Sequence, residues 1–279
     1  MNTAAIGIFD SGLGGLTVAR EIAQQLPHES LVYVGDTARC PYGPRDASEV
    51  QRYVLEIGQF LQNQGVKLMV IACNTATSYG LELAQQTFDI PVIGVVYPGA
   101  RAAVRATKAR RVAVIGTRGT IYSAAYPKAI AALDAGIDVF SRATPEFVDI
   151  VEAGFDSSAA TDVPTNGELR ELAEGYLCPL VANGADVLVL GCTHYPVLAE
   201  ALQAVVGPEV TLISSAAEVA TEVKCTLMRR GHLAGDNRVP EYTFYTTDDD
   251  VATFKRHGSR AFGADLGEVH HLELDEETA

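Results

Sequence analysis

Two cysteines at matched places in the chain are the residues best suited to chemistry. Cys73 and Cys192 each end a short apolar run. Hydrogen-bonding side chains follow both: Asn74, Thr75 and Thr77 after the first cysteine, and Thr193 and His194 after the second. Nearby donors favour a thiolate over a thiol. Two separated thiols, with no lysine in either motif for a pyridoxal Schiff base, favour cofactor-independent proton exchange at a prochiral carbon. One thiolate removes a proton from one face, and the other thiol returns one to the opposite face.

Asp10 and His194 are the groups that could assist such thiols. Asp10 opens the segment Asp-Ser-Gly-Leu-Gly-Gly, which follows the first apolar run. Its glycines permit a tight turn that aims backbone N–H groups at an anion, although the pattern is a weak nucleotide signature. The carboxylate could hold a substrate ammonium or orient a base. His194 could relay a proton for Cys192 or could be structural.

Several other polar residues have weaker signals. The run Pro41-Tyr42-Gly43-Pro44 is a turn by composition, which either punctuates the chain or shapes a pocket. Glu152, taken alone, is expected to be a surface carboxylate near a helix end. The remaining cysteines have no matched partner and are expected to be structural: Cys40, Cys178 and Cys225. Five cysteines without a CxxC pair indicate a reducing compartment, and no Cys/His cluster predicts a metal site.

Alternating apolar runs and helical periodicity predict an α/β protein with parallel sheets covered by helices. Strands are expected near 5–9, 31–34, 68–72, 92–96, 112–115, 137–140, 187–190, 210–213 and 242–245. Helices are expected near 15–26, 47–64, 77–87, 121–133, 169–183, 197–206 and 216–230. Two of them carry capping-box signatures, Asp46 with Glu49 and Ser215 with Glu218.

An internal similarity indicates two related halves. The segment 68–75 resembles 187–194, and the segment 6–11 resembles 112–117, in the same order. Ligands of parallel sheets bind beyond the carboxyl ends of the strands, where all four segments end. We therefore expect two pseudo-symmetric, doubly wound domains, 1–96 with 208–279 and 97–207, with parallel sheets facing a central cleft and a cysteine on each wall.

Composition excludes several classes of function. The 279 residues carry 21 Lys and Arg against 35 Asp and Glu, a net charge of −14, which disfavours nucleic-acid binding and gives an anionic substrate no long-range attraction. Apolar residues make up 48% of the chain, yet no window is long and apolar enough for a membrane span. The amino terminus lacks the pattern of a signal peptide, so a cytoplasmic protein is expected.

Four motifs together resemble one known family, the glutamate racemases of the aspartate/glutamate racemase superfamily. They are Asp10-Ser-Gly-Leu-Gly-Gly, Gly35-Asp-Thr-Ala-Arg-Cys-Pro-Tyr-Gly-Pro-Arg, Ala72-Cys-Asn-Thr-Ala-Thr and Gly191-Cys-Thr-His-Tyr-Pro. The resemblance spans residues 6–231, and the end, 273–279, is expected to be a solvated acidic tail.

The resemblance implies an isomerase that interconverts L- and D-glutamate without pyridoxal phosphate or any other cofactor and supplies D-glutamate for peptidoglycan. It implies a homodimer of two-domain chains. By motif match, Cys73 and Cys192 would act on opposite faces of Cα, with Asp10 assisting Cys73, and His194 and Glu152 assisting Cys192. The substrate-binding residues would be Asp10, Ser11, Pro41, Tyr42, Gly43, Asn74, Thr75, Thr77, Thr117, Thr120, Thr193 and His194.

Other functions remain open at this point. Within the superfamily these are an aspartate or hydantoin racemase, disfavoured by the Pro-Tyr-Gly and Cys-Thr-His-Tyr contexts, and a single-thiol decarboxylase, disfavoured by the second thiol. A regulatory protein is a different class, because some glutamate racemases inhibit DNA gyrase and an acidic chain can engage a basic surface. A non-catalytic glutamate-binding protein would show affinity without exchange at Cα.

Overall fold

The computed structural model describes residues 3–156 and 167–274. The chain divides into two units, residues 1–95 with 216–279 and residues 96–215. The first unit is therefore made of two separate stretches of sequence, and the second unit is inserted between them.

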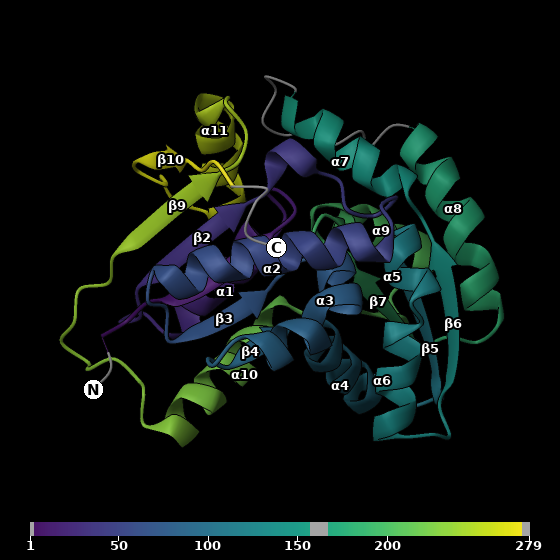
Figure 1. Ribbon diagram of the computed structural model, residues 1–279. Helices are drawn as coiled ribbons and strands as arrows, with labels where there is room; N and C mark the ends of the chain where they lie inside the picture. Colours follow the sequence, from purple (N-terminus) through teal and green to yellow (C-terminus); the bar gives the residue numbers. More distant parts are fainter. Residues whose placement is uncertain (1–2, 157–166, 275–279) are drawn as a thin grey trace. The chain divides into compact units, whose positions relative to one another are not determined.

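The first unit is a six-stranded parallel sheet with helices on both faces (Figure 1). Its strand order is β10-β9-β2-β1-β3-β4, with bounds β1 (Ile6–Asp10), β2 (Leu31–Gly35), β3 (Leu68–Ile71), β4 (Val92–Gly94), β9 (Tyr242–Thr246) and β10 (Val269–His271). Its helices are α1 (Leu16–Gln25), α2 (Ala47–Asn63), α3 (Asn74–Thr87), α10 (Ala216–Arg230) and α11 (Val251–Phe262), with the 3-10 helix η1 (Thr37–Arg39). Helix α1 packs against α10 and α11, while α2 packs against α3.

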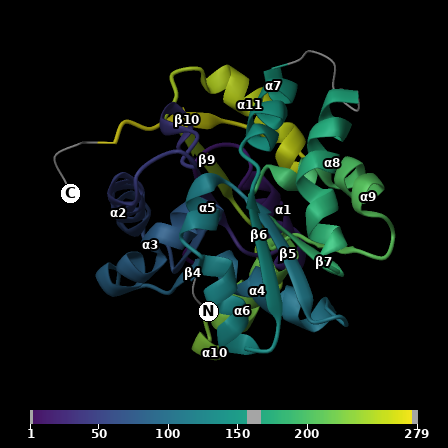
Figure 2. The same ribbon diagram turned by 90° about the vertical axis from the view of Figure 1, so that its right-hand side faces the viewer.

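The second unit contains a four-stranded parallel sheet of order β6-β5-β7-β8. Figure 2 labels β5, β6 and β7 of this sheet. Its strands are β5 (Arg111–Gly116), β6 (Asp138–Ala143), β7 (Val187–Gly191) and β8 (Thr211–Ile213). Its helices are α4 (Val96–Ala106), α5 (Arg118–Tyr122), α6 (Ala125–Leu133), α7 (Glu146–Asp156), α8 (Gly167–Ala182) and α9 (Ala199–Val206), with the 3-10 helix η2 (Tyr195–Leu198).

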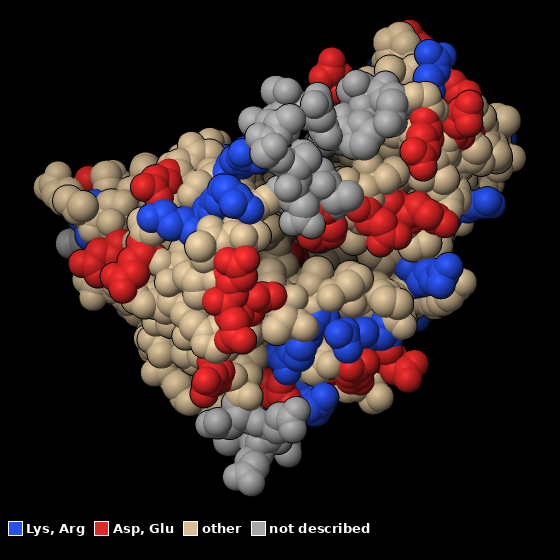
Figure 3. Space-filling view, turned by 90° about the horizontal axis from the view of Figure 1, so that it is seen from above, with Lys and Arg blue, Asp and Glu red and all other residues tan. Residues whose placement is uncertain are grey.

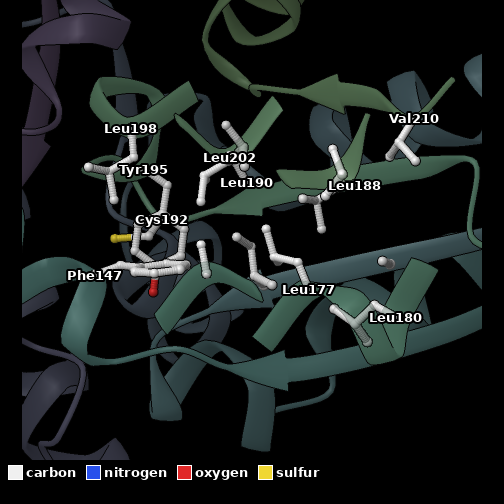
Figure 4. Packing of buried hydrophobic residues seen from close by; sticks show 14 of the residues in the cluster. Phe147, Leu177, Leu180, Leu188, Leu190, Cys192, Tyr195, Leu198, Leu202 and Val210 are labelled. Carbon is white, nitrogen blue, oxygen red and sulfur yellow. The ribbon is translucent and has the colours of Figure 1, made fainter. Parts of the chain in front are cut away.

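Alternating side chains of the central strands supply both cores of the second unit. Val112 and Val114 of β5 pack with α4 and α6, whereas Ala113 and Ile115 pack with α7, α8 and α9. Successive strand residues point to opposite faces, so a run that is apolar throughout is buried on both faces. Figure 4 shows the second of these clusters, which runs from Leu180 and Val210 to Cys192 and Phe147 at the other end.

The two sheets repeat one topology. The order β2-β1-β3-β4 of the first sheet has the same connectivity as β6-β5-β7-β8 of the second. Strands β1 and β5 are therefore equivalent, as are β3 and β7, which run into Cys73 and Cys192. The predicted fold class, two similar doubly wound halves with parallel sheets, is confirmed. Strands β9 and β10 are additions that only the first sheet has among the described residues.

All nine predicted strands are present, whereas several other elements were missed. Strand β10 and helices α4, α7 and α11 have no counterpart in the expectations. Helix α4 begins Val-Tyr-Pro-Gly, a composition typical of a turn, although proline is tolerated in a first helical turn. The helix expected over 121–133 is two helices, because Ala124 adopts a left-handed conformation (φ 54°) between α5 and α6.

Two further expectations differ from the structure. Asp46 does stand at the amino end of α2, but its side chain makes no cap hydrogen bond, and the carboxylate of Glu49 instead contacts Arg45 and Tyr53. The predicted return to the first domain at residue 208 would include β8. The structure pairs β8 with β7, because its Leu212 belongs with the core of the second unit.

Every described helix is too short or too polar to cross a membrane. Of the expected acidic tail, 275–279 lies outside the described residues.

Candidate active site

Asp10 is the last residue of β1 and is completely buried. Its Oδ2 accepts a hydrogen bond from the backbone N–H of Gly12 at 3.1 Å, so the carboxylate folds the loop that leads into α1. Only glycine fits at position 15, because a Cβ there would lie 2.4 Å from Cβ of Asp10. The start of α1 therefore packs directly on Asp10. Ser11, between these residues, is also buried.

The side chain of Tyr33 also holds this loop. Its hydroxyl donates to the carbonyl of Gly12 at 2.8 Å. Burial raises the pKa of Tyr33 well above its usual value, and nearby Asp10, Cys73 and Cys40 raise it further. The hydroxyl therefore stays protonated as a donor. Tyr33 was missed by the sequence analysis, since a tyrosine within an apolar strand has no distinguishing signal.

Cys73 lies at the amino end of α3 and is only 5% exposed. Its Sγ accepts a hydrogen bond from the N–H of Ala76 at 3.5 Å, in the way that a serine caps a helix. Unpaired N–H groups and the helix dipole place partial positive charge at this end of a helix, which favours an anion. The fold thus gives Cys73 a setting that suits a thiolate.

The polar residues after Cys73 are all buried in the first turn of α3. Asn74 and Thr75 lie next to the sulfur in sequence and are 3% and 2% exposed. Thr77 is already engaged, because its hydroxyl donates to the carbonyl of Ile71 and accepts from the N–H of Val95. These two bonds tie β3 to the end of β4, so the hydroxyl of Thr77 has a structural use that the sequence did not reveal.

The predicted turn of residues 41–44 belongs to a loop, residues 36–45, that leaves β2 beside Asp10. The Cys40–Pro41 peptide is cis, Pro41 is exposed, and Tyr42 and Gly43 are buried. The hydroxyl of Tyr42 donates to Asp36, a completely buried carboxylate at the end of β2. The hydroxyl of Tyr42 thus donates its hydrogen bond within the protein and is not available as a donor to a ligand.

Asp36 was missed although the signal that identified Asp10 applies to it: a carboxylate directly after a buried strand. Its backbone N–H donates to the carbonyl of Asp10 at 3.0 Å, which sets the two strand ends side by side. Arg39 approaches it through Nε, at 2.7 Å from Oδ2. The contacts of Asp36 therefore hold the loop in place.

Cys192 begins the corresponding group of residues in the second unit. It follows β7 and is 7% exposed. Its Sγ lies 3.6 Å from Nδ1 of His194, and Nε2 of His194 contacts Oε1 of Glu152 on α7. The structure thus brings together a thiol, an imidazole and a carboxylate. Glu152, which supplies the carboxylate, is 40 or more residues away from the other two in the sequence.

His194 favours its charged form in this setting. Burial lowers the pKa of the imidazole, but the hydrogen bonds with Cys192 and Glu152 outweigh that effect and raise its pKa well above the usual value of 6.5. An imidazolium at 3.6 Å favours a thiolate on Cys192 and can return a proton to it.

Thr117 follows β5 as Ser11 follows β1, and Thr120 lies three residues further along the chain. Thr117 caps α5, because its Oγ1 accepts from the N–H of Thr120 at 3.3 Å. The two hydroxyls are also 3.1 Å apart and hydrogen-bonded. Thr193, beside Cys192, is 6% exposed. Because Gly116 pairs with Gly191, buried polar side chains follow both the cysteine strand and its neighbour in the second unit, as they do in the first.

Tyr195 anchors the Cys192 segment in the core. Its hydroxyl donates to the carbonyl of Thr144 at 2.8 Å and accepts from Oγ1 of that residue at 2.9 Å. Its ring meets Phe147 edge-on at 5.6 Å, and Figure 4 shows both rings beside Cys192. Because Phe147 and Glu152 share α7, this contact fixes the helix that brings Glu152 to His194.

The other cysteines separate into two kinds. Cys178 and Cys225 are exposed on helices. Cys40 is half-buried beside the Asp10 loop, where a Cβ on Gly12 would lie 3.3 Å from its Sγ. Within the described ranges, His, Cys, Asp and Glu side chains form no group of three that could hold a metal ion. On the face in Figure 3, basic side chains are interspersed with acidic ones.

Comparison with known proteins is consistent with this arrangement of residues. The family model described as Asp/Glu/Hydantoin racemase matches residues 6–223. A glutamate racemase of Exiguobacterium sibiricum is 48% identical over 252 residues, 90% of each chain.

Solved structures extend the similarity to the fold. A glutamate racemase isoform of Bacillus anthracis has a TM-score of 0.90 at 42% identity, covering 98% of this chain and 99% of its own. The glutamate racemase of Francisella tularensis, solved in complex with D-glutamate, has a TM-score of 0.87 at 31% identity, covering 99% of each chain.

Proposed function

Because the chain belongs to the Asp/Glu/hydantoin racemase family and is therefore an isomerase, we propose that it interconverts L- and D-glutamate without a cofactor. The observation that carries the proposal is the matched pair of cysteines. Equivalent strands of two sheets of the same topology each end in a buried thiol, with a group beside each that favours its anion. A reaction that is the same in both directions needs such a pair.

The proton balance of the reaction gives one thiol the role of base and the other the role of acid. One thiolate takes the proton from Cα and becomes a thiol, while the other thiol gives a proton to the opposite face of the carbon and becomes a thiolate. No electrons are transferred, and the substrate keeps its charge. For the reverse direction the two cysteines, Cys73 and Cys192, exchange roles.

The low acidity of an amino-acid Cα–H is the main difficulty of this reaction. A carbanion-like transition state must be stabilised by donors that are already oriented. The candidates are buried polar groups at the ends of the cysteine strands and of the strands paired with them: Ser11, Asn74 and Thr75 in the first unit, and Thr117, Thr120 and Thr193 in the second. Their burial excludes water, which strengthens each hydrogen bond to the developing charge.

Each thiol has its own assisting group in this proposal. Asp10 assists Cys73, either by accepting its proton or by holding the substrate ammonium. His194, charged and held by Glu152, assists Cys192. Tyr42 and Gly43, in the loop of residues 36–45, bind a substrate carboxylate. Tyr42 does so through its backbone, because its hydroxyl donates to Asp36.

The biological part of the proposal is that the chain supplies D-glutamate for peptidoglycan, in the cytoplasm and as a homodimer. Complementation of a bacterial strain that requires D-glutamate tests the supply. Sedimentation of the purified chain at several concentrations tests the dimer, which a single monomer peak would contradict.

Exchange of the Cα proton in deuterated water is the direct test of the activity. Enzyme freed of metal and of pyridoxal phosphate is incubated separately with L- and with D-glutamate. Proton NMR follows the Cα signal, and circular dichroism follows chirality. We expect loss of the Cα signal from both enantiomers, with the optical signal falling to zero.

Two outcomes would contradict the proposal. Folded, reduced enzyme that exchanges neither enantiomer is not a glutamate racemase, and aspartate and hydantoins become the next substrates to test. Saturable glutamate binding without exchange would indicate a binding protein.

A further inference from the structure

The carboxyl end of β9 contacts the loop of residues 36–45, which the proposed function makes part of the glutamate site. Strand β9 lies beside β2 (Figure 1). The two strands pair in parallel, with Thr246 opposite Gly35. Thr246 and Thr247 therefore lie next to the point where the loop begins at Asp36. Both threonines lie beyond residues 6–223, the part of the chain that the family model matches.

Side-chain hydrogen bonds join β9 to the loop at three points. Oγ1 of Thr247 donates to Oδ1 of Asp36 at 2.8 Å and accepts from the N–H of Ala38 at 3.1 Å. Oγ1 of Thr246 lies 2.5 Å from Oγ1 of Thr37. One hydroxyl, that of Thr247, thus bridges the carboxylate at the start of the loop and the backbone two residues later.

Asp36 is the centre of this network. Its Oδ1 accepts from Thr247 and from Nε of Arg39 at 3.0 Å, and its Oδ2 accepts from Arg39 and from the hydroxyl of Tyr42. A completely buried carboxylate needs such donors, because an unsatisfied buried charge is strongly unfavourable. The position of Tyr42 therefore depends on where Asp36 is held.

Arg39 is fixed on its other side as well. It forms an ion pair with the buried Glu56 of α2, and its guanidinium lies 3.9 Å from the centre of the Tyr53 ring. Burial lowers the pKa of Arg39, but Asp36 and Glu56 outweigh this and raise it, so the guanidinium stays charged. The body of the unit thus clamps the loop through α2, and β9 clamps it through Thr247.

We propose that Thr247, with Thr246, is a positioning residue for glutamate binding: the end of β9 holds Asp36, and Asp36 holds the Tyr42–Gly43 part of the site. This inference rests on the proposed function. Neither threonine touches the reacting atoms. Loss of the Thr247 hydroxyl loosens the loop and weakens binding of the substrate and the transition state alike, which raises KM and leaves kcat nearly unchanged.

Three substitutions at one position separate the hydroxyl from the shape of the side chain. Thr247→Val keeps the shape of the side chain and removes its two hydrogen bonds. Thr247→Ser keeps the hydroxyl but not the methyl group, and Thr247→Ala removes the hydroxyl and the methyl group. Thr221→Val is the matched control. Thr221 lies in the same unit, and its exposed hydroxyl donates to the carbonyl of Ala217 and to Oε1 of Gln25, neither of which belongs to the loop of residues 36–45.

Two measurements are made on each variant. Amide hydrogen exchange, followed by mass spectrometry, is compared in peptides covering 36–45 and in peptides covering β1 and β3. Racemisation of glutamate gives KM and kcat. We expect faster exchange in 36–45 alone and a KM raised roughly 5- to 30-fold for Thr247→Val and Thr247→Ala, with kcat within about twofold. Thr247→Ser and Thr221→Val should resemble the wild type in both.

The outcomes are distinguishable. Unchanged exchange in 36–45 for Thr247→Val would overturn the anchoring role, and faster exchange with unchanged KM would overturn its importance for binding. A Thr247→Ser variant as impaired as Thr247→Val would show that side-chain shape, not the hydroxyl, matters. A wild-type chain that binds and racemises no glutamate would contradict the proposed function and positioning for that substrate, while the exchange data would still report whether β9 anchors the loop.

Discussion

Cys73 and Cys192 occupy equivalent places in two sheets of one topology, yet the chain surrounds them differently. Cys73 opens the 14-residue helix α3 and accepts a hydrogen bond from the N–H of Ala76. Cys192 runs into η2, four residues of 3-10 helix with a proline at its start, and the sulfur instead faces the imidazole of His194. The first thiol is supported by backbone, and the second by an ionisable side chain.

This difference teaches how two similar halves can be made unequal. The partial charge at a helix start is fixed and does not titrate. An imidazolium supplies a full charge and a transferable proton, but only while its pKa exceeds the pH. At the first half-site, Cys73 at the start of α3, the support from the helix should therefore not change with pH. At the second, Cys192 beside His194, the support from the imidazolium should be lost as the pH rises through the pKa of His194. The second half-site also depends on α7 for Glu152, which must be packed correctly before His194 is held.

A second difference lies at the sheet edge. In the first sheet β9 and β10 lie beyond β2, and the loop after β2 is held from both sides. In the second sheet the equivalent strand, β6, is the edge of the sheet. The additions thus support the one loop that the proposed function assigns to substrate binding.

Removing either thiol should have the largest effect. Cys73→Ala and Cys192→Ala should each abolish racemisation, a loss of at least roughly 10⁴-fold, because proton transfer on one face of Cα has no replacement. Circular dichroism of L- and D-glutamate measures it. Cys225→Ala and Cys178→Ala, at exposed positions, are the controls and should keep wild-type rates. Near-normal turnover of either active-site variant would remove that cysteine from the mechanism.

Loss of the imidazole should have the next largest effect, and only on the second half-site. His194→Asn should lower kcat roughly 10²-fold, since the positioned acid beside Cys192 is removed while the thiol remains. The matched substitution His270→Asn, on β10, should stay within about twofold. Equal rates for the two variants, measured by the same assay, would mean that Cys192 needs no imidazole, and the contrast between the half-sites would fail.

The stability of the chain should reveal the charge on His194. Its pKa is raised in the folded state, so its contribution to stability is complete below about pH 6.5, the value in an unfolded chain, and is lost as the pH rises through the folded pKa. The difference in the free energy of unfolding between wild type and His194→Asn should therefore narrow as the pH rises. Urea unfolding at several pH values measures it, and a difference that widens with pH would show a neutral imidazole.

A buried methyl group gives the smallest effect and sharpens the comparison of the two units. Gly15→Ala should destabilise the chain by about 1–3 kcal/mol, because the new Cβ would lie 2.4 Å from Cβ of Asp10. Gly175→Ala, on α8 of the second unit, meets no atom within 4 Å and should stabilise it by about 0.5–1 kcal/mol. Thermal and urea unfolding measure both. A stable Gly15→Ala variant would mean that the start of α1 can move away from Asp10.

Much of the site could be located from sequence because strand ends are local features. A buried strand is an apolar run, and the residue after it lies at the carboxyl edge of the sheet wherever the strand is placed. This rule located Asp10, Cys73, Thr117 and Cys192. It applies equally to Asp36, which comes directly after β2.

Helices with unusual beginnings were the weakest part of the sequence interpretation. Helix α4 has a Pro-Gly pair in its first turn, and Ala124 breaks a helical pattern with a conformation that alanine rarely adopts. Tertiary packing, against β7 for α4, outweighs such local preferences.

The sequence by itself determined the parallel α/β class, the repeated order of motifs and the two cysteines, because periodicity and strand ends are encoded within a few residues. Only the tertiary structure decided the partners: Glu152 with His194, Thr247 with Asp36, and the use of the Tyr42 and Thr77 hydroxyls within the protein itself. Such contacts join residues that are distant in sequence, or depend on the direction of one hydroxyl. They exist only once the strands have paired and the helices have packed on them.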